Sequence, residues 1–377
     1  MTAPLLPVLD AALAADGTMT IAEYMRMALT HPEHGYYVTQ TPFGVDGDFI
    51  TAPEISQMFG ELLGLWCFEQ LRLQDNLNNA ALMELGPGRG TLMTDILRTV
   101  TPIAPDAPWP VHLVEVSPEL QRQQLEALDG HAVTHHRDLT TMPPQPVVFI
   151  ANEFFDALPI RQYENTKHGW RERRVAMAEN GLTITTDAGI SAGMADEAPS
   201  FPPAEIGQIA EMAPDLPAII TTMADHITTY GGAALIIDYG KDNPIGDSLQ
   251  AVRDHQPVHI LDTPGHADLS AWVDFSAIRA AAENTGAENA GAEIAGAEVL
   301  GPVGQGEFLK ALGLYHRAEQ LSAGAEPDIR RALAAAVDRL SSPAQMGEVF
   351  KVMAILPKGF AESVQGVAGF PWPSAEK

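Results

Sequence analysis

The sequence predicts an α/β protein built on a mainly parallel sheet, with a ligand site at one edge of that sheet. Two observations lead to this prediction. Residues 81–91 form an apolar strand that enters a glycine-rich turn, and Leu92, Ile96 and Leu97 then recur at helical spacing. Further apolar runs at 111–116, 132–136, 147–151, 233–238 and 349–356 alternate with helical patterns, which is typical of a parallel sheet.

The turn after the first strand indicates what kind of ligand is bound. Its glycines are Gly86, Gly88 and Gly90, and Glu84 stands two residues before the first of them. A dinucleotide loop needs a third glycine where this chain has Thr91, and a P-loop needs a lysine that is absent. The arrangement resembles motif I of the S-adenosylmethionine-dependent methyltransferases, although any strand-to-helix turn of an α/β protein can carry glycines.

Length and charge exclude several classes of partner. The chain has 377 residues and is 46% hydrophobic, enough for one large domain with insertions or for two domains. Its formal net charge is −27. Such a balance argues against a nucleic-acid partner and against an anionic membrane surface, and it favours a basic substrate. No stretch is long and apolar enough for membrane insertion.

The N-terminus and the cysteine content predict a compartment. Residues 1–17 contain two aspartates, no arginine and no long apolar run, so they resemble neither a signal peptide nor a transit peptide. Cys67 is the only cysteine, and its apolar neighbours favour an inert core thiol. We therefore expect a cytoplasmic, prokaryotic-like protein.

The remaining elements follow in chain order. Residues 1–30 predict helix, with Thr20 near an N-cap position, and a glycine- and aromatic-rich loop precedes a helix at 57–73. Strand periodicity from Arg161 to Thr186 predicts an inserted hairpin or meander. Helices are expected at 204–230, 304–309 and 328–340. Surface or connecting loops are expected at 188–203, 246–274 and 286–300, and the last of these is a Gly-Ala-Glu repeat.

These elements divide the chain into four expected segments. Residues 1–76 supply N-terminal helices and a cofactor-covering loop, and 77–160 the first half of the core. Residues 161–230 supply the inserted hairpin and helices, and 231–377 the second half of the core with its own loops and helices.

Several motifs taken together resemble the MidA-type methyltransferases, the family of a mitochondrial complex I assembly factor that methylates an arginine. The resemblance covers most of the chain and rests on these stretches: Phe43-Gly44, 47–56, 84–90, 152–159, 238–240, Asp268-Leu269, 273–275 and Gln305-Gly306. It implies a class I, seven-stranded, Rossmann-like methyltransferase sheet with an N-terminal helical segment and an inserted substrate-side region. It also implies S-adenosyl-L-methionine as methyl donor.

The acceptor implied by the resemblance is an accessible arginine of a protein, such as a subunit of respiratory complex I or its homologue. Two alternatives stay open. A small-molecule methyltransferase needs the same cofactor residues and a closed apolar pocket, whereas a non-enzymatic assembly factor needs only the scaffold. The acceptor protein, the methylation state of the product and the oligomeric state are left undetermined by the sequence.

The expected cofactor site combines residues from several strand ends. Glu84 and the backbone of Gly86, Gly88 and Gly90 are expected to hold the methionine part. Glu115, an acid about 30 residues after Gly86 in the next strand, is expected to bind the ribose hydroxyls. The adenine is assigned to Asp138 and Leu139, and the remaining cofactor contacts to Thr51, Pro53 and Asn152.

The expected catalytic residues are three carboxylates, because carboxylates can hold a planar guanidinium through paired hydrogen bonds. Glu153 is the first choice, Asp156 lies one helical turn later, and Glu54 is a second candidate. The alternative is that Asn152, Glu153 and Asp156 merely cap a helix. The loop at 47–54 is expected to close over the cofactor beside Tyr36 and Tyr37, unless these tyrosines belong to the core. No metal site is expected.

Overall fold

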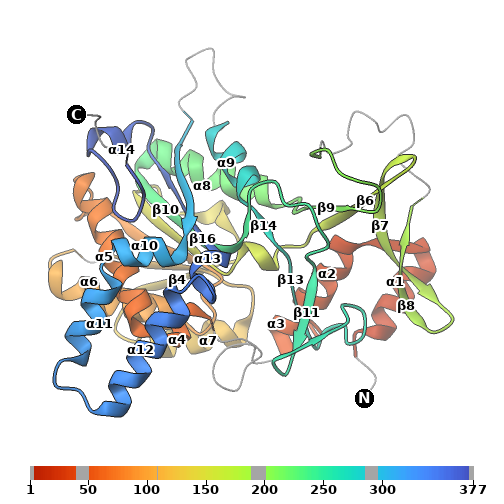
Figure 1. The fold of residues 1–377 in the computed structure, drawn as a ribbon, viewed down its shortest axis with the longest axis horizontal. Coiled ribbons are helices and arrows are strands. Elements are labelled where there is room, and N and C mark those ends of the chain that lie inside the picture. The colour runs from red at the N-terminus through yellow and green to blue at the C-terminus, as the bar shows by residue number, and fades with distance from the viewer. Residues whose placement is uncertain (1–3, 40–50, 108, 188–200, 285–295, 373–377) are drawn as a thin grey trace. The chain divides into compact units, whose positions relative to one another are not determined.

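The chain forms two structural units, each assembled from separate stretches of sequence (Figure 1). The computed structural model describes residues 4–39, 51–107, 109–187, 201–284 and 296–372. Unit 1 contains residues 1–49, 156–216 and 241–274, and unit 2 contains residues 50–155, 217–240 and 275–377. Unit 2 therefore holds the glycine-rich turn and the strands predicted around it.

The sheet of unit 2 has seven strands along one path, as the family resemblance implied. Its path is β15-β16-β10-β5-β2-β3-β4. The strands β2, β3, β4, β5 and β10 pair in parallel, and β16 runs antiparallel to both β10 and β15. Their bounds are Ala81–Leu85 (β2), Val111–Val114 (β3), Val133–His136 (β4), Val147–Asn152 (β5), Gly232–Lys241 (β10), Glu298–Gly304 (β15) and Phe350–Leu356 (β16). The predicted strands are confirmed. Strand β15 was not predicted, because residues 298–300 were expected to belong to a connecting loop.

The central strands of this sheet are covered on both faces, which explains their continuous apolar runs. Leu82, Val148 and Leu235 belong to one core cluster together with residues of α5 and α6. Phe149, one position along β5, packs edge-on against His226 of α8 with ring centroids 5.5 Å apart. Successive side chains of a strand point to opposite faces, so the sheet separates two apolar layers.

The helices of unit 2 include those predicted at 57–73, 304–309 and 328–340 and after the glycine-rich turn, and also a short helix at Ala52–Ile55 where a loop was expected. They are α4 (Ala52–Ile55), α5 (Gln57–Leu73), α6 (Thr91–Ile103), α7 (Pro118–Ala127), α8 (Leu216–Tyr230), α9 (Phe275–Glu283), α10 (Gln305–Ala311), α11 (Leu314–Ser322), α12 (Pro327–Ser341), α13 (Met346–Val349) and α14 (Phe360–Ser363). A short 3-10 turn, η1, spans Leu139–Thr141. Helices α5 and α6 approach each other closely at Gly60. A Cβ on this residue would lie only 2.5 Å from the Cβ of Asp95, so a larger residue would not fit there.

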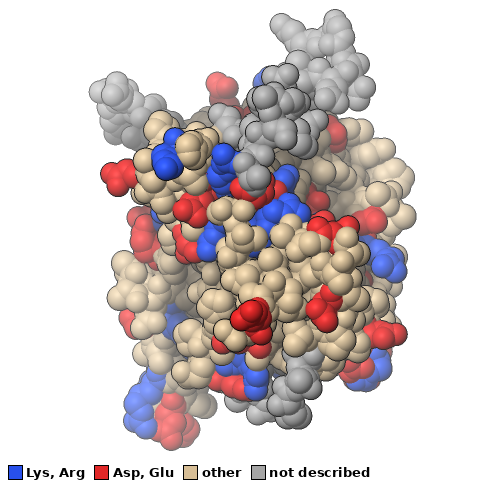
Figure 2. All heavy atoms as spheres, turned by 90° about the vertical axis from the view of Figure 1, so that its right-hand side faces the viewer, with Lys and Arg blue, Asp and Glu red and all other residues tan. Residues whose placement is uncertain are grey.

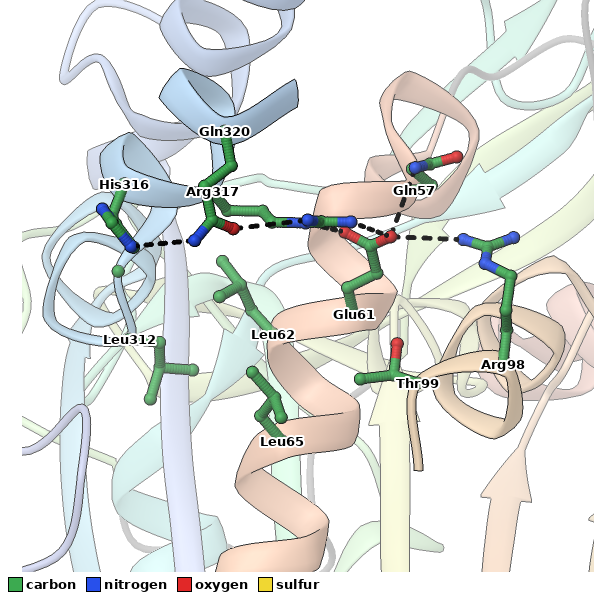
Figure 3. A pocket seen from close by; sticks show the side chains of 11 residues that line it. Gln57, Glu61, Leu62, Leu65, Arg98, Thr99, Leu312, His316, Arg317 and Gln320 are labelled. Carbon is green, nitrogen blue, oxygen red and sulfur yellow. Dashed lines mark hydrogen bonds and ion pairs between the residues drawn. The ribbon is translucent and has the colours of Figure 1, made fainter. Parts of the chain in front are cut away.

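A pocket of about 640 Å³ lies beside α5, α6 and α11, and Glu61 stands at its centre (Figure 3). The side chain of Glu61 is only 9% exposed and accepts hydrogen bonds from Nε and Nη2 of Arg317, at 2.8 and 3.0 Å. Gln57 donates to the same carboxylate at 3.2 Å, and Arg98 lies 3.6 Å away. The pocket walls include none of the predicted cofactor or catalytic residues.

Unit 1 combines N-terminal helices with small antiparallel sheets. Its elements are α1 (Leu6–Asp16), β1 (Thr18–Thr20), α2 (Ile21–Thr30), α3 (Tyr36–Thr39), β6 (Arg161–Thr166), β7 (Gly169–Ala178), β8 (Gly181–Thr186), β9 (Ile209–Met212), β11 (Gln250–Arg253), β12 (Gln256–Val258), β13 (Asp268–Ser270) and β14 (Val273–Asp274). Along the sequence, the chain passes from unit 2 to unit 1 within the 3-10 turn η2 (Phe155–Ala157). The predicted meander is confirmed as β6, β7 and β8.

Two sequence expectations for unit 1 are wrong. The region 204–230 is not wholly helical, because Ile209–Met212 pairs with β6 as β9. The region 246–274 is not a plain loop, because β11 pairs with both β12 and β13. These strands have only three or four residues, too few for an alternating pattern to stand out.

The N-terminal region joins the core of unit 1 through local and distant contacts. Thr20 caps α2, and its side chain and that of Glu23 form a reciprocal capping box. Strand β1 pairs with β7 about 155 residues further along, with Met19 opposite Val175. Leu9, Tyr24 and Val175 then belong to one buried cluster. The expected N-cap is confirmed, although a short strand interrupts the expected helix.

Parts of the sequence predictions lie outside the described residues. These are residues 47–50 of the covering loop expected at 47–54, the motif residues Phe43 and Gly44, and most of the Gly-Ala-Glu repeat, up to residue 295. The division of the chain into four segments stays a prediction. Among the described residues, no helix is both long and apolar enough to cross a membrane. On the face drawn in Figure 2, acidic and basic side chains are interspersed.

We predict that Glu61→Gln destabilises the protein by about 2 kcal/mol, because two arginines and Gln57 lose a largely buried carboxylate. The partial exposure of Arg317 and Arg98, 35% and 49%, keeps the loss below that of a fully buried pair. Urea unfolding followed by circular dichroism measures the change. Glu69→Gln, which breaks only the exposed pair with Arg72, is the control. Equal losses of unfolding free energy in the two variants would contradict the stabilising role given to Glu61.

Candidate active site

The glycine-rich turn joins the end of β2 to the start of α6. All three glycines have positive φ: 63° at Gly86, 52° at Gly88 and 83° at Gly90, values that side-chain-bearing residues rarely adopt. A Cβ on Gly86 would lie 2.9 Å from the ring of Phe154, which follows β5. The turn therefore keeps a backbone surface at the carboxyl ends of β2 and β5, where the strand order of the sheet reverses.

Two buried polar atoms at this edge have no hydrogen-bond partner among the described residues, Oε2 of Glu84 and Oδ1 of Asn152. Burial raises the pKa of Glu84 to about 8, which the backbone N–H of Met93 opposes in part. An unpartnered buried acceptor is costly unless a ligand donates to it. These two acceptors and the glycine backbone therefore fit the expected S-adenosyl-L-methionine, whose amino-acid part carries an ammonium donor.

Glu115 stands just after β3 and is held in a fixed position. Its Oε1 accepts from the backbone N–H of Ser117 at 2.8 Å, and its Oε2 from Nε2 of Gln124 at 3.3 Å. Burial raises the pKa of this carboxyl. The same Nε2 of Gln124 donates to the carbonyl oxygen of Gly88 at 2.7 Å, and Oε1 of Gln124 lies 2.8 Å from Nε2 of His135.

Gln124 was missed by sequence reasoning. It lies in α7, is fully buried and joins the glycine turn to Glu115 and to β4. Its backbone also packs beside Gly90, where a Cβ would lie at an ordinary contact distance of 3.6 Å, so the positive φ of Gly90 is the reason for the glycine. The sequence offered no signal for it beyond a glutamine at one position of an ordinary helix.

Asp138 and Leu139 follow β4, as expected. Asp138 is exposed, and its Oδ1 accepts from the backbone N–H and from the hydroxyl of Thr140, at 2.9 and 2.5 Å. These bonds lower the pKa of Asp138. Leu139 is buried at the start of η1. The backbone N–H of Glu115 donates to the carbonyl of His136 at 3.0 Å, so the ends of β3 and β4 lie side by side.

Glu153 follows β5 in a left-handed conformation with φ of 54°. Its Oε1 accepts from the backbone N–H of Ala52 and from Nδ2 of Asn152, both at 3.2 Å. Burial raises the pKa of Glu153 to about 7, against the effect of these bonds and of the charge on Arg339. Burial therefore leaves this carboxyl titrating near neutrality.

The short helix α4 brings the second candidate carboxylate to the same region. Thr51 begins the helix and accepts at its carbonyl from the backbone N–H of Glu54, at 2.9 Å, and Pro53 is buried in its first turn. Oε1 of Glu54 accepts from the hydroxyl of Thr91 at 2.8 Å. Helix α4 is thus bonded both to the start of α6 and, through Ala52, to Glu153.

Two expectations about the segment after β5 need correction. Glu153 and Asp156 are not one helical turn apart, because the chain is left-handed at Glu153 and then makes only η2. For the same reason Asn152 and Glu153 do not cap an α-helix. Asp156 belongs to unit 1, where its carbonyl accepts from Ala271, and a shared role with Glu153 stays a prediction.

The two tyrosines have separate roles in unit 1. Tyr36 is buried in the apolar cluster of that unit. The hydroxyl of Tyr37 donates to Oδ1 of Asp268 at 2.8 Å, and burial raises the pKa of Tyr37 well above its usual value. Among the described residues, no three histidine, cysteine or acidic side chains are grouped closely enough to hold a metal ion.

Comparisons with known proteins identify the family of this chain. Residues 62–293 match a family model described as an S-adenosyl-L-methionine-dependent methyltransferase. A protein arginine methyltransferase, NDUFAF7, from Danio rerio is 37% identical, with 93% of this chain and 86% of that protein covered. The Homo sapiens protein of the same name is 35% identical, with 98% and 90% covered. The chain belongs to this methyltransferase family.

A solved structure supports the cofactor and the fold of this methyltransferase. A Burkholderia thailandensis protein bound to S-adenosyl-homocysteine superposes with a TM-score of 0.78 and 27% identity, covering 93% of this chain and 91% of that one. The chain is therefore an S-adenosyl-L-methionine-dependent enzyme with the class I α/β methyltransferase fold.

The expectation of a cytoplasmic, prokaryotic-like protein is wrong. The relatives from Danio rerio and Homo sapiens are named as mitochondrial proteins, as is the homologue from Drosophila melanogaster, which is 34% identical with 93% of this chain and 84% of that protein covered. The error came from treating the composition of the N-terminus as a sign of location.

We predict that cofactor binding at pH 7 releases about one proton from Glu84, because a nearby ammonium group lowers the raised pKa of this carboxyl. Calorimetric titration of S-adenosyl-homocysteine in buffers of different ionisation enthalpy measures the release. Glu84→Gln should remove it, and Gly88→Val should prevent binding altogether. Wild-type binding without proton release would contradict the assignment of Glu84.

Gln124→Leu should weaken S-adenosyl-homocysteine binding by about 10- to 100-fold, because hydrogen bonds to Gly88, Glu115 and His135 are lost together. Isothermal titration gives the dissociation constant. Gln123→Leu in the same helix, which loses only a bond to Glu119, should bind the ligand as the wild type does. An unchanged dissociation constant for Gln124→Leu would show that the glycine turn and Glu115 keep their positions without it.

Proposed function

We propose that this methyltransferase methylates a side-chain nitrogen of an arginine in a protein, and that the protein is a subunit of respiratory complex I. The observation that carries the proposal is Glu153, a carboxylate held at the carboxyl end of β5 with a pKa raised to about 7. The arginine acceptor is supported by the names of the relatives. The complex I acceptor rests on the resemblance to the assembly-factor family.

The cofactor contacts follow from the strand ends. Glu84 and Asn152 accept from the amino-acid part, and the backbone of Gly86, Gly88 and Gly90 passes beside it. Glu115 accepts from the ribose hydroxyls, and Asp138 and Leu139 border the adenine. Thr51 and Pro53, at the start of α4, also contact S-adenosyl-L-methionine. When bound, S-adenosyl-L-methionine supplies a methyl group on a sulfonium, which is electrophilic.

The chain contributes orientation and a proton acceptor. Carboxylates of Glu153 and Glu54 accept N–H bonds from the planar guanidinium and direct one nitrogen toward the methyl group. That nitrogen loses a proton as its new bond to carbon forms. Glu153 can take this proton, because a carboxyl with a pKa of about 7 holds it far better than an ordinary glutamate.

The test uses labelled methyl groups and an acceptor that lacks the modification. Purified complex I from cells in which this gene is deleted is incubated with the enzyme and methyl-labelled S-adenosyl-L-methionine. Hydrolysis and chromatography then identify the labelled amino acid. Label in methylarginine supports the proposal. Label only in a small molecule of an extract from the same cells supports the alternative enzyme, and methylarginine in another protein alone rejects the complex I acceptor.

Glu153→Gln should lower the turnover number by about 100-fold, because the proton acceptor and one guanidinium ligand are lost. In the wild type, kcat/KM for the protein acceptor should rise as the pH increases through about 7, because this ratio reports the ionisation of Glu153 before the cationic acceptor binds. The glutamine of the Glu153→Gln variant does not ionise, so the variant should not show this rise. A wild-type kcat/KM that is constant from pH 6 to pH 8 would contradict the role of Glu153.

A further inference from the structure

The conformation of Glu153 requires support from the rest of unit 2. A non-glycine residue with positive φ is strained by about 1 kcal/mol or more, and it persists only where neighbouring contacts impose it. Glu153 has φ of 54°, and its backbone N–H donates to the carbonyl of Ile237 at 2.9 Å. Strand β10 therefore holds the peptide at the start of this turn.

Asp238, the next residue of β10, holds the other side of the turn. Its side chain is fully buried, and Oδ2 accepts from the backbone N–H groups of Phe154 and Phe155, at 3.2 and 2.9 Å. The second oxygen, Oδ1, accepts from the backbone N–H of Tyr239 at 2.9 Å. One buried carboxylate thus satisfies two backbone donors that immediately follow Glu153.

The pairing of the two strands explains why this acid stands here. Ile237 is the register partner of Asn152 in the parallel pair β10 and β5, so Asp238 comes level with Glu153 where the pairing ends. Past that point the N–H groups of Phe154 and Phe155 no longer have a strand to bond. Buried backbone donors need hydrogen-bond partners, and here the carboxylate of Asp238 supplies the acceptor that a neighbouring strand would otherwise provide.

We propose that Asp238 is a positioning residue that fixes the left-handed turn at Glu153 and so aims its carboxylate at the acceptor. This inference rests on the proposed function. According to this inference, Asp238 affects the reaction through the position of Glu153 and needs no contact with the acceptor or the cofactor. The Asp238-Tyr-Gly sequence, which helped to identify the family resemblance, thereby gains a physical role.

The test compares Asp238→Asn with the wild type. An amide keeps one acceptor oxygen and has a donor NH2 group in place of the other, so it cannot accept from Phe154, Phe155 and Tyr239 together as the carboxylate does. The turn therefore loosens while the strands remain paired. We expect the turnover number to fall by about 30-fold or more, with the dissociation constant of S-adenosyl-homocysteine within about twofold of wild type. Asp95→Asn, another buried aspartate of unit 2, is the control for lost stability without loss of turnover.

A double-mutant cycle separates positioning from a general structural role. If Asp238 acts through Glu153, Asp238→Asn should lower turnover no further in a Glu153→Gln background. A structural role would instead add its loss to that of Glu153→Gln and would weaken cofactor binding. Additive losses would therefore overturn the inference.

Hydrogen exchange gives an answer that does not depend on the acceptor. The amides of Phe154 and Phe155 should exchange at least about tenfold faster in Asp238→Asn than in the wild type, with the amides of β5 unchanged. Unchanged exchange at Phe154 and Phe155 would overturn the inference. An absence of wild-type methylarginine formation would reject the proposed function, while the exchange result still decides whether Asp238 holds the turn.

Discussion

The site depends on the parallel pairing of β2 with β5. Leu85 is the register partner of Ala151, so the two chains leave the sheet at the same level. The glycine turn and Glu153 are therefore neighbours although about 65 residues separate them in the sequence. The close approach of Gly86 to Phe154 shows how little space remains between them, and a side chain at Gly86 would push the two turns apart.

Burial at this edge stores free energy that ligands can release. The pKa of Glu84 rises from 4.5 to about 8 and that of Glu153 from 4.5 to about 7. For a carboxyl whose pKa is raised on folding, the favourable contribution is complete below pH 4.5 and is lost as the pH rises through the folded value. The ligand-free site thus becomes less stable toward pH 8, and cations brought by the ligands offset that loss.

Local patterns predicted the parts of the site that lie within one turn of chain. The spacing of Gly86, Gly88 and Gly90 after an apolar strand was enough to place a ligand cradle, and Glu115 could be placed from the next strand. Gln124 and the role of Asp238 could not be predicted in this way, because their partners lie on other elements. The short strands β9 and β11 were missed because they have no alternating pattern of their own. They are defined by pairing with β6 and β13, respectively.

The charge of the chain agrees with the chemistry of its site. Both ligands of the proposed reaction are cationic, and a net charge of −27 attracts cations over long distances at low ionic strength. Near the site the attraction has to be local, and a buried carboxylate held ionised with no counter-ion would be costly. Protonation of Glu84 in the free enzyme avoids that cost. Ionisation then accompanies the arrival of a positive group, so the site discriminates against neutral ligands of the same shape.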